Sequence, residues 1–146
     1  MIIERVPTKV ISIGNVRLGG SEPIRVQSMT NTDTRDVPAT LAQIEELAQE
    51  GCEIVRVAVR DKESILALKK IVEAARVPIV ADIHFNYRLA IMAVEAGAKG
   101  LRINPGNIGG RQKILEVVKC AKDHQVPIRV GVNAGSLERE LALKYG

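Results

Sequence analysis

The sequence predicts an α/β fold: a partial (β/α)8 TIM-type barrel, made of the first five β/α units and preceded by an N-terminal β-hairpin. Apolar strand-like segments begin at intervals of roughly 22 to 30 residues, which is the period of β/α units. Helix-type periodicity fills the intervals between them. An open doubly wound sheet is the alternative, but no G-x-G-x-x-G follows the first strand, which disfavours a dinucleotide-binding fold.

The hairpin is predicted at residues 9–18, where apolar and polar residues alternate around Gly14-Asn15, a dipeptide suited to a two-residue turn. A hairpin ahead of a parallel fold commonly covers one end of it. We therefore expect residues 1–22 to form an N-terminal hairpin cap and residues 23–146 to form the β/α units.

The β/α units follow from apolar runs and helix boundary signals. Gly51 and Gly97 suit positions just after a helix, and Asp61 suits an N-cap. Pro78 and Pro127 stand at strand entries, where proline is tolerated. The predicted strands are 24–29, 54–59, 78–85, 101–104 and 128–133, and the predicted helices are 37–50, 62–75, 87–96, 111–123 and one from Ser136 onward.

Composition bounds the class of protein. Hydrophobic residues make up 46% and charged residues 26%, as in an ordinary soluble domain, while aromatics are only 2%, so Ile, Val, Leu and Ala must build the core. The net charge is +4, but Lys and Arg form no runs and no aromatics interleave with them, which disfavours nucleic acid. No segment resembles a signal peptide or a membrane span, so we expect a cytoplasmic protein.

Polar side chains interrupt strands that should be apolar on both faces. Because strand residues alternate in direction, residues two apart share one face. An isolated buried charge is costly, so arginines in the middle of three strands need a partner, and guanidinium groups match phosphate oxygens. The candidate binding residues are Arg56, Asp82, His84, Asn86, Arg102, Asn104, Arg129 and Asn133.

Alternatives remain open at these positions. The arginines could point outward past the helices, or could pair with residues outside this stretch. Asp82 and His84 suit hydrogen bonds to ligand hydroxyls or the orientation of an arginine, whereas a metal would need more ligands than one His and a carboxylate. Asn86 could cap the next helix. One or two ligand contacts are expected within 27–32, without a choice among them.

Two glycine-rich stretches follow strands, at 104–110 and 133–136. Their backbone N–H groups could approach an anion, although glycine is also common in ordinary connections. The two cysteines, Cys52 and Cys120, lie far apart without ligand spacing and are expected to be small core residues. We predict no metal site within this chain.

Five phrases, read together, carry a family resemblance: VQSMTNTDT (26–34), IVRVAV (54–59), VADIHFNYRLA (80–90), LRINPGNIG (101–109) and IRVGVNAGSLE (128–138). They resemble the barrel domain of the 4-hydroxy-3-methylbut-2-enyl diphosphate synthase family, over essentially the whole chain. The resemblance implies a dihydropteroate synthase-like barrel in an iron–sulfur oxidoreductase of the non-mevalonate isoprenoid pathway.

The resemblance implies a reaction and partners. The family opens the ring of 2-C-methyl-D-erythritol 2,4-cyclodiphosphate by a two-electron reduction, with flavodoxin or ferredoxin as electron donor. It implies that Arg56, Arg102, Arg129 and Asn133 bind the diphosphate, and that the other candidate residues line the same site. It also implies a homodimer in the full-length protein.

The resemblance implies that the chemistry needs residues outside this chain. In the family, a C-terminal domain absent from this chain carries three cysteines and a glutamate that hold a 4Fe–4S cluster, and Cys52 and Cys120 do not match that motif. The catalytic residues are expected in the missing part, and this portion alone is expected to be inactive. We expect it to be the front part of a larger barrel.

Two other functions stay open from the residues alone. One is a cluster-free phosphate-ester or pterin-type barrel enzyme related to dihydropteroate synthase, which would carry no coloured redox group. The other is a non-catalytic module that binds anions or nucleic acid, which would show salt-dependent retention on DNA.

Overall fold

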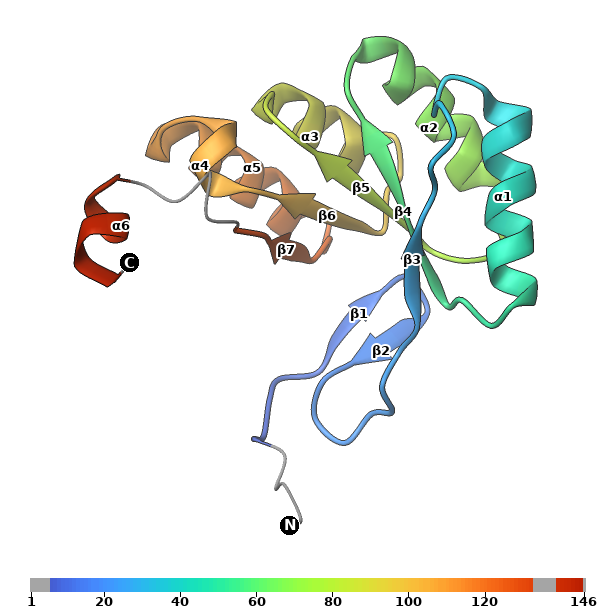
Figure 1. The fold of residues 1–146 in the computed structure, drawn as a ribbon, viewed down its shortest axis with the longest axis horizontal. Coiled ribbons are helices and arrows are strands. Elements are labelled where there is room, and N and C mark those ends of the chain that lie inside the picture. The colour runs from blue at the N-terminus through green and yellow to red at the C-terminus, as the bar shows by residue number, and fades with distance from the viewer. Residues whose placement is uncertain (1–5, 133–138, 146) are drawn as a thin grey trace.

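The computed structural model describes residues 6–132 and 139–145 (Figure 1). A short hairpin comes first, and strands and helices then alternate along the chain. The strands are β1 (Ile11–Ile13), β2 (Val16–Leu18), β3 (Gln27–Met29), β4 (Ile54–Val59), β5 (Ile79–Ile83), β6 (Gly100–Ile103) and β7 (Ile128–Val130). The helices are α1 (Val37–Gln49), α2 (Lys62–Ala74), α3 (Tyr87–Glu95), α4 (Pro105–Ile108), α5 (Arg111–Asp123) and α6 (Arg139–Tyr145).

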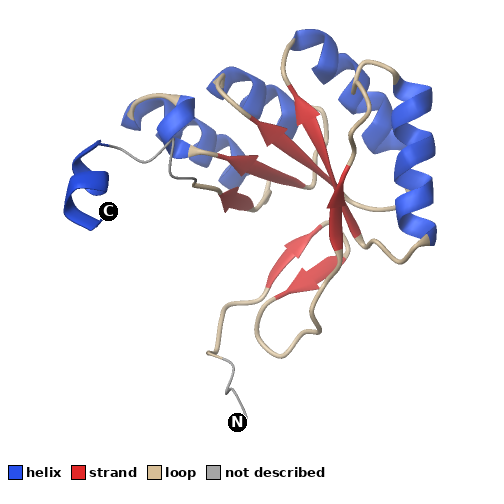
Figure 2. Cartoon of the chain, viewed as in Figure 1, coloured by secondary structure: helices blue, strands red, loops and turns tan. Residues whose placement is uncertain are grey.

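Strands β3 to β7 form one parallel sheet in the order of the chain, β3-β4-β5-β6-β7. In a doubly wound sheet the order in which strands are added reverses partway through the chain, whereas in a barrel each new strand is added beside the previous one. The predicted run of barrel-type β/α units is therefore confirmed. Figure 2 shows α1, α2, α3 and α5 in an arc along one side of this sheet, with the hairpin on the other side.

The outer face of the sheet, the face under the helices, holds the main core. On β4, Val55, Val57 and Val59 point to this face and are almost completely buried. They pack with apolar side chains of α2 and α3, such as Leu68 and Ala90. This alternation leaves the residues between them, Arg56 among them, on the inner face.

The hairpin lies against the N-terminal end of the inner face. Its register pairs Ile13 with Val16, and Gly14 adopts a φ of 58°, which a two-residue turn of this kind requires. Ile13 packs against Ile54 and Val80, two inner-face residues at the start of their strands. The apolar end of the inner face is thus covered, and its polar end lies beyond.

Several strands are shorter than the sequence predicted. The strand predicted at 24–29 is confined to Gln27–Met29, because Arg25 and the Val26 N–H are taken up by the carboxylate of Glu53. The strand predicted at 78–85 ends at Ile83, and the one predicted at 128–133 ends at Val130. The glycine-rich stretch after β6 contains the short helix α4, and Ser136 lies outside the described residues.

The two cysteines differ in their surroundings. Cys52 is buried and its thiol donates to the carbonyl of Ile54 at 3.1 Å, as expected of a small core residue. Cys120 on α5 is only partly buried, so that expectation was right for Cys52 and too strong for Cys120. Within the described residues, no helix has the length and apolar character needed to cross a membrane.

Helix α2 offers a test of this packing. Leu68→Ala removes a side chain that is 0% exposed, and we expect it to lower the free energy of unfolding by about 2–5 kcal/mol. Leu66→Ala, on the same helix but 69% exposed, should change it by less than about 0.5 kcal/mol. Urea denaturation of both variants checks this, and equal effects would show that α2 does not pack through Leu68.

Candidate functional site

The strand register places the predicted charged residues on the inner face at two levels. Arg56 is the Cα partner of Met29 on one side and of Val80 on the other. One step further toward the C-terminal ends, Asp82 is the partner of Arg102, and Arg102 is the partner of Arg129. Active sites of parallel barrels form at this end of the strands.

Asp82 is the centre of the site. It is 2% exposed, and its two carboxylate oxygens contact two arginines from neighbouring strands. Oδ2 lies 3.2 Å from Arg56 Nε, and Oδ1 lies 3.3 Å from Arg102 Nη1. The alternative that Arg56 and Arg102 point outward past the helices is therefore wrong, and the proposed role of Asp82 in orienting an arginine is what the geometry supports.

Arg56 has a second, weaker partner. Its Nε and Nη2 atoms lie 3.3 and 3.2 Å from the sulfur of Met29. A thioether is a poor hydrogen-bond acceptor, so an anionic oxygen competes well for these donors. Met29 belongs to the stretch 27–32, within which one or two ligand contacts were expected, and it lies against Arg56.

Gly131 determines where Arg102 can lie. A Cβ atom built on this glycine would come within 2.7 Å of both Nε and Nη2 of Arg102, closer than such atoms can approach. The guanidinium therefore rests against bare backbone, just past the end of β7. Sequence reasoning missed Gly131, although a glycine at an inner-facing strand position is a signal of close approach.

Arg129 lies apart from the pair that Asp82 holds. It is exposed and forms no ion pair with any residue in 6–132 or 139–145. It lines a cavity of about 190 Å³ together with Gln27 and Val80, toward the hairpin. Two of the three predicted arginines are thus joined by one carboxylate, and the third keeps a free guanidinium.

The asparagines have structural partners. Asn86 caps α3, since its side-chain oxygen accepts a hydrogen bond from the Arg88 N–H at 3.0 Å. The alternative prediction, that Asn86 caps the next helix, is confirmed. Asn104 is 1% exposed and caps α4 through the Gly106 N–H at 3.1 Å. Asn133 lies outside the described residues. His84 is half-buried just past β5 and contacts the ring of Phe85.

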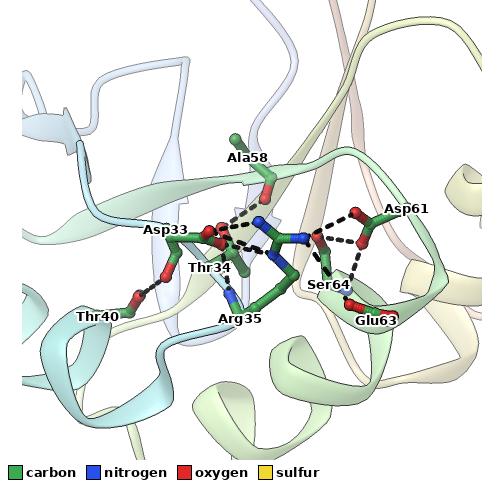
Figure 3. A network of polar contacts seen from close by, with 8 residues as sticks. All are labelled: Asp33, Thr34, Arg35, Thr40, Ala58, Asp61, Glu63 and Ser64. Atoms are coloured by element: carbon green, nitrogen blue, oxygen red, sulfur yellow. Dashed lines mark hydrogen bonds and ion pairs between the residues drawn. The ribbon is translucent and has the colours of Figure 1, made fainter.

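A polar network fastens the loop after β3 across the end of β4 (Figure 3). The Thr34 hydroxyl donates to the Ala58 carbonyl at 2.6 Å, in the place where a longer β3 would supply the next ladder bond. Arg35 binds Asp33 through two nitrogens and lies 3.8 Å from both Asp61 and Glu63. These hydrogen bonds from Arg35 lower the pKa of Asp33 to about 2.

The described residues do not suit a metal or an iron–sulfur cluster. No group of three His, Cys, Asp or Glu side chains within them could hold an ion. Cys52 is buried in the core, and burial raises the pKa of the Cys120 thiol, which disfavours the thiolate that a cluster needs. The arrangement can bind and orient an anion.

Comparisons with known proteins agree with this architecture. A family model described as the GcpE TIM-barrel domain matches residues 8–146. A protein of Maridesulfovibrio salexigens named 4-hydroxy-3-methylbut-2-en-1-yl diphosphate synthase (flavodoxin) is 59% identical over 145 residues, which is 99% of this chain and 40% of that protein. A protein of the same name from Caldanaerobacter subterraneus is 56% identical over 146 residues and 41% of its length. The chain thus spans about 40% of the length of these relatives.

The similarity of this chain to solved structures concerns the fold alone. The 7,8-dihydropteroate synthase of Vibrio fischeri aligns with a TM-score of 0.62 at 17% identity, covering 84% of this chain and 48% of that one. A tryptophan synthase chain of M. tuberculosis aligns with a TM-score of 0.55, also at 17% identity, covering 74% and 55%. At this identity the likeness carries no statement about chemistry.

The shared carboxylate predicts a stability effect. Asp82→Asn leaves Arg56 and Arg102 without their counter-charge, and we expect the free energy of unfolding to fall by about 1.5–3 kcal/mol. The control is Glu45→Gln, which breaks an exposed ion pair with Arg76 and should cost less than about 1 kcal/mol. Chemical denaturation measures both, and a neutral Asp82→Asn variant would contradict the role given to this carboxylate.

Gly131 predicts an effect on binding without a large effect on folding. In Gly131→Ala the added methyl displaces the Arg102 guanidinium, the mobile end of a side chain, so we expect pyrophosphate affinity to fall about tenfold with a stability change under about 1 kcal/mol. Gly110→Ala, whose added methyl meets open space, is the control. Calorimetric titration with pyrophosphate is the measurement. Unchanged affinity in Gly131→Ala would mean that Arg102 is not a ligand-binding group.

Proposed function

The chain belongs to the GcpE TIM-barrel domain family, and from this we propose that it forms the diphosphate-binding wall of a 4-hydroxy-3-methylbut-2-enyl diphosphate synthase. The observation that carries the proposal is the pair of arginines that share Asp82, beside the unpaired Arg129. Arg56 and Arg102 share one carboxylate on this wall, and Arg129 adds a third positive charge closer to the hairpin. The excess of positive charge suits a ligand with two phosphate groups.

Each residue has a part in binding 2-C-methyl-D-erythritol 2,4-cyclodiphosphate. Arg56 and Arg102 hold phosphate oxygens, and Asp82 keeps both guanidinium groups in place before the ligand arrives. Arg129 supplies a third cation, and Asn133 belongs to the same proposed set. His84, Asn86 and Asn104 lie at the ends of their strands, where they would line the part of the site that receives the hydroxyl groups.

The reaction itself needs more than this chain. We propose that the full-length protein is an oxidoreductase that opens the ring of the cyclic diphosphate with two electrons from flavodoxin or ferredoxin, and that this chain alone is inactive. The electrons would pass through a 4Fe–4S cluster held by a later domain, because the residues described in this chain do not suit one. We also propose that residues 1–22 form a cap and that the full-length protein is a cytoplasmic homodimer.

Arg102 provides the test of the pocket. In the full-length protein, Arg102→Ala should weaken binding of the cyclic diphosphate by about 1.5–3 kcal/mol, the cost of a lost charge-assisted contact. Arg102→Lys should also lose affinity, because an ammonium cannot reproduce the two-point guanidinium contact. Titration calorimetry without a reductant measures binding apart from turnover. An unchanged dissociation constant in Arg102→Ala would refute this pocket.

A further inference from the structure

Arg60 continues the inner-face series of β4 past the end of the strand. Arg56, Ala58 and Arg60 are two residues apart, so their side chains leave the same side of the chain. The register pairs Val59 with Ile83, which puts Arg60 level with His84 at the mouth of the site. Both residues line a groove of about 330 Å³ together with Phe85 and Asn86, and its floor is formed by Val59 and Leu89 of the core under the helices. Arg60 was not among the residues that the sequence singled out.

Arg60 is less tightly held than its neighbour Arg35, because its charge lowers the pKa of Asp33 only from a distance, without an ion pair within the described residues. Arg35 and Arg60 both line a polar cavity of about 210 Å³ between the loops that follow β3 and β4. Arg35 is held by Asp33, Asp61 and Glu63, as Figure 3 shows. Arg60, in contrast, is exposed and makes no hydrogen bond or ion pair with any residue in the described ranges.

The nearby carboxylates are already occupied. Asp33 accepts two hydrogen bonds from the Arg35 guanidinium, and Asp61 accepts from both the N–H and the hydroxyl of Ser64. Asp82, deeper in the site, is shared by Arg56 and Arg102. The positive charge of Arg60 acts on Asp33, whose pKa it helps to lower, but within the described residues no hydrogen bond or ion pair joins Arg60 to a carboxylate.

We propose that Arg60 is a rim cation of the anion pocket, which attracts a diphosphate ligand to the mouth that it shares with His84. This inference rests on the function proposed above and adds to it a residue outside the proposed binding set. An exposed cation beside a basic cleft raises the local concentration of an anionic ligand. Because the charge is exposed, salt screens its effect. A partly buried cation such as Arg102 is screened much less.

The test compares dissociation constants for the cyclic diphosphate in the full-length protein, measured by calorimetry without reductant at ionic strengths of about 0.02 M and 0.3 M. Arg60→Gln should weaken binding about 3-fold to 10-fold at the lower ionic strength and less than about 2-fold at the higher one. Arg60→Lys keeps the charge and should behave like the unaltered protein.

Two controls make the result specific. Arg76→Gln removes the same charge from a side chain that lines a different cavity, beside the turn of the hairpin, and should leave both constants unchanged. Arg102→Ala should weaken binding at both ionic strengths.

The outcomes separate this inference from the proposed function. If Arg102→Ala weakens binding while Arg60→Gln matches the unaltered protein, the rim cation is refuted and the pocket stands. A loss in Arg60→Gln that is equally large at both ionic strengths also refutes it, because that is the behaviour of a direct contact. If the unaltered protein does not bind the cyclic diphosphate, the proposed function and this inference fail together.

Discussion

The site depends on one buried carboxylate with two arginines. Asp82 lies on the central strand of the sheet, and its neighbours β4 and β6 each contribute one guanidinium to it. Without Asp82, Arg56 on β4 and Arg102 on β6 would be two like charges on either side of β5, each costly to desolvate. With it, both are held in place while several of their N–H groups have no strong acceptor among the described residues. The proposed binding of a diphosphate would then require little reorganisation of the protein.

This arrangement is possible because the two faces of the sheet differ in composition and in role. The outer face is packed with Val, Ile, Leu and Ala against the helices and supplies the core. The inner face is apolar only at its N-terminal end, where Ile13 of the hairpin packs against Ile54 and Val80. Its C-terminal end is left for polar groups. Most of the stability and the proposed ligand binding therefore rest on different residues of the same strands, with Asp82 contributing to both.

Small and capping residues shape the mouth of the site as much as the charged ones. Gly131 leaves the room that the Arg102 guanidinium occupies. Asn86 and Asn104 begin the helices that follow β5 and β6, so their amides fix the backbone at the ends of those strands. The hydroxyl of Thr34 completes the hydrogen bonding of β4 where β3 stops. These hydrogen bonds hold the ends of β4, β5 and β6 in place.

The sequence by itself determined the order of strands and helices, because period-two and helical patterns, with Gly and Pro at the boundaries, are local properties of the chain. It also predicted that Arg56, Asp82 and Arg102 lie on the polar face of their strands, since the apolar residues that flank each of them must point to the opposite face. Only the tertiary structure decided that Asp82 is shared by two arginines, that Met29 and Gly131 shape their positions, and that Arg60 forms no ion pair within the described residues. Those relations depend on the register between strands and on distances across the sheet, which a linear pattern does not contain.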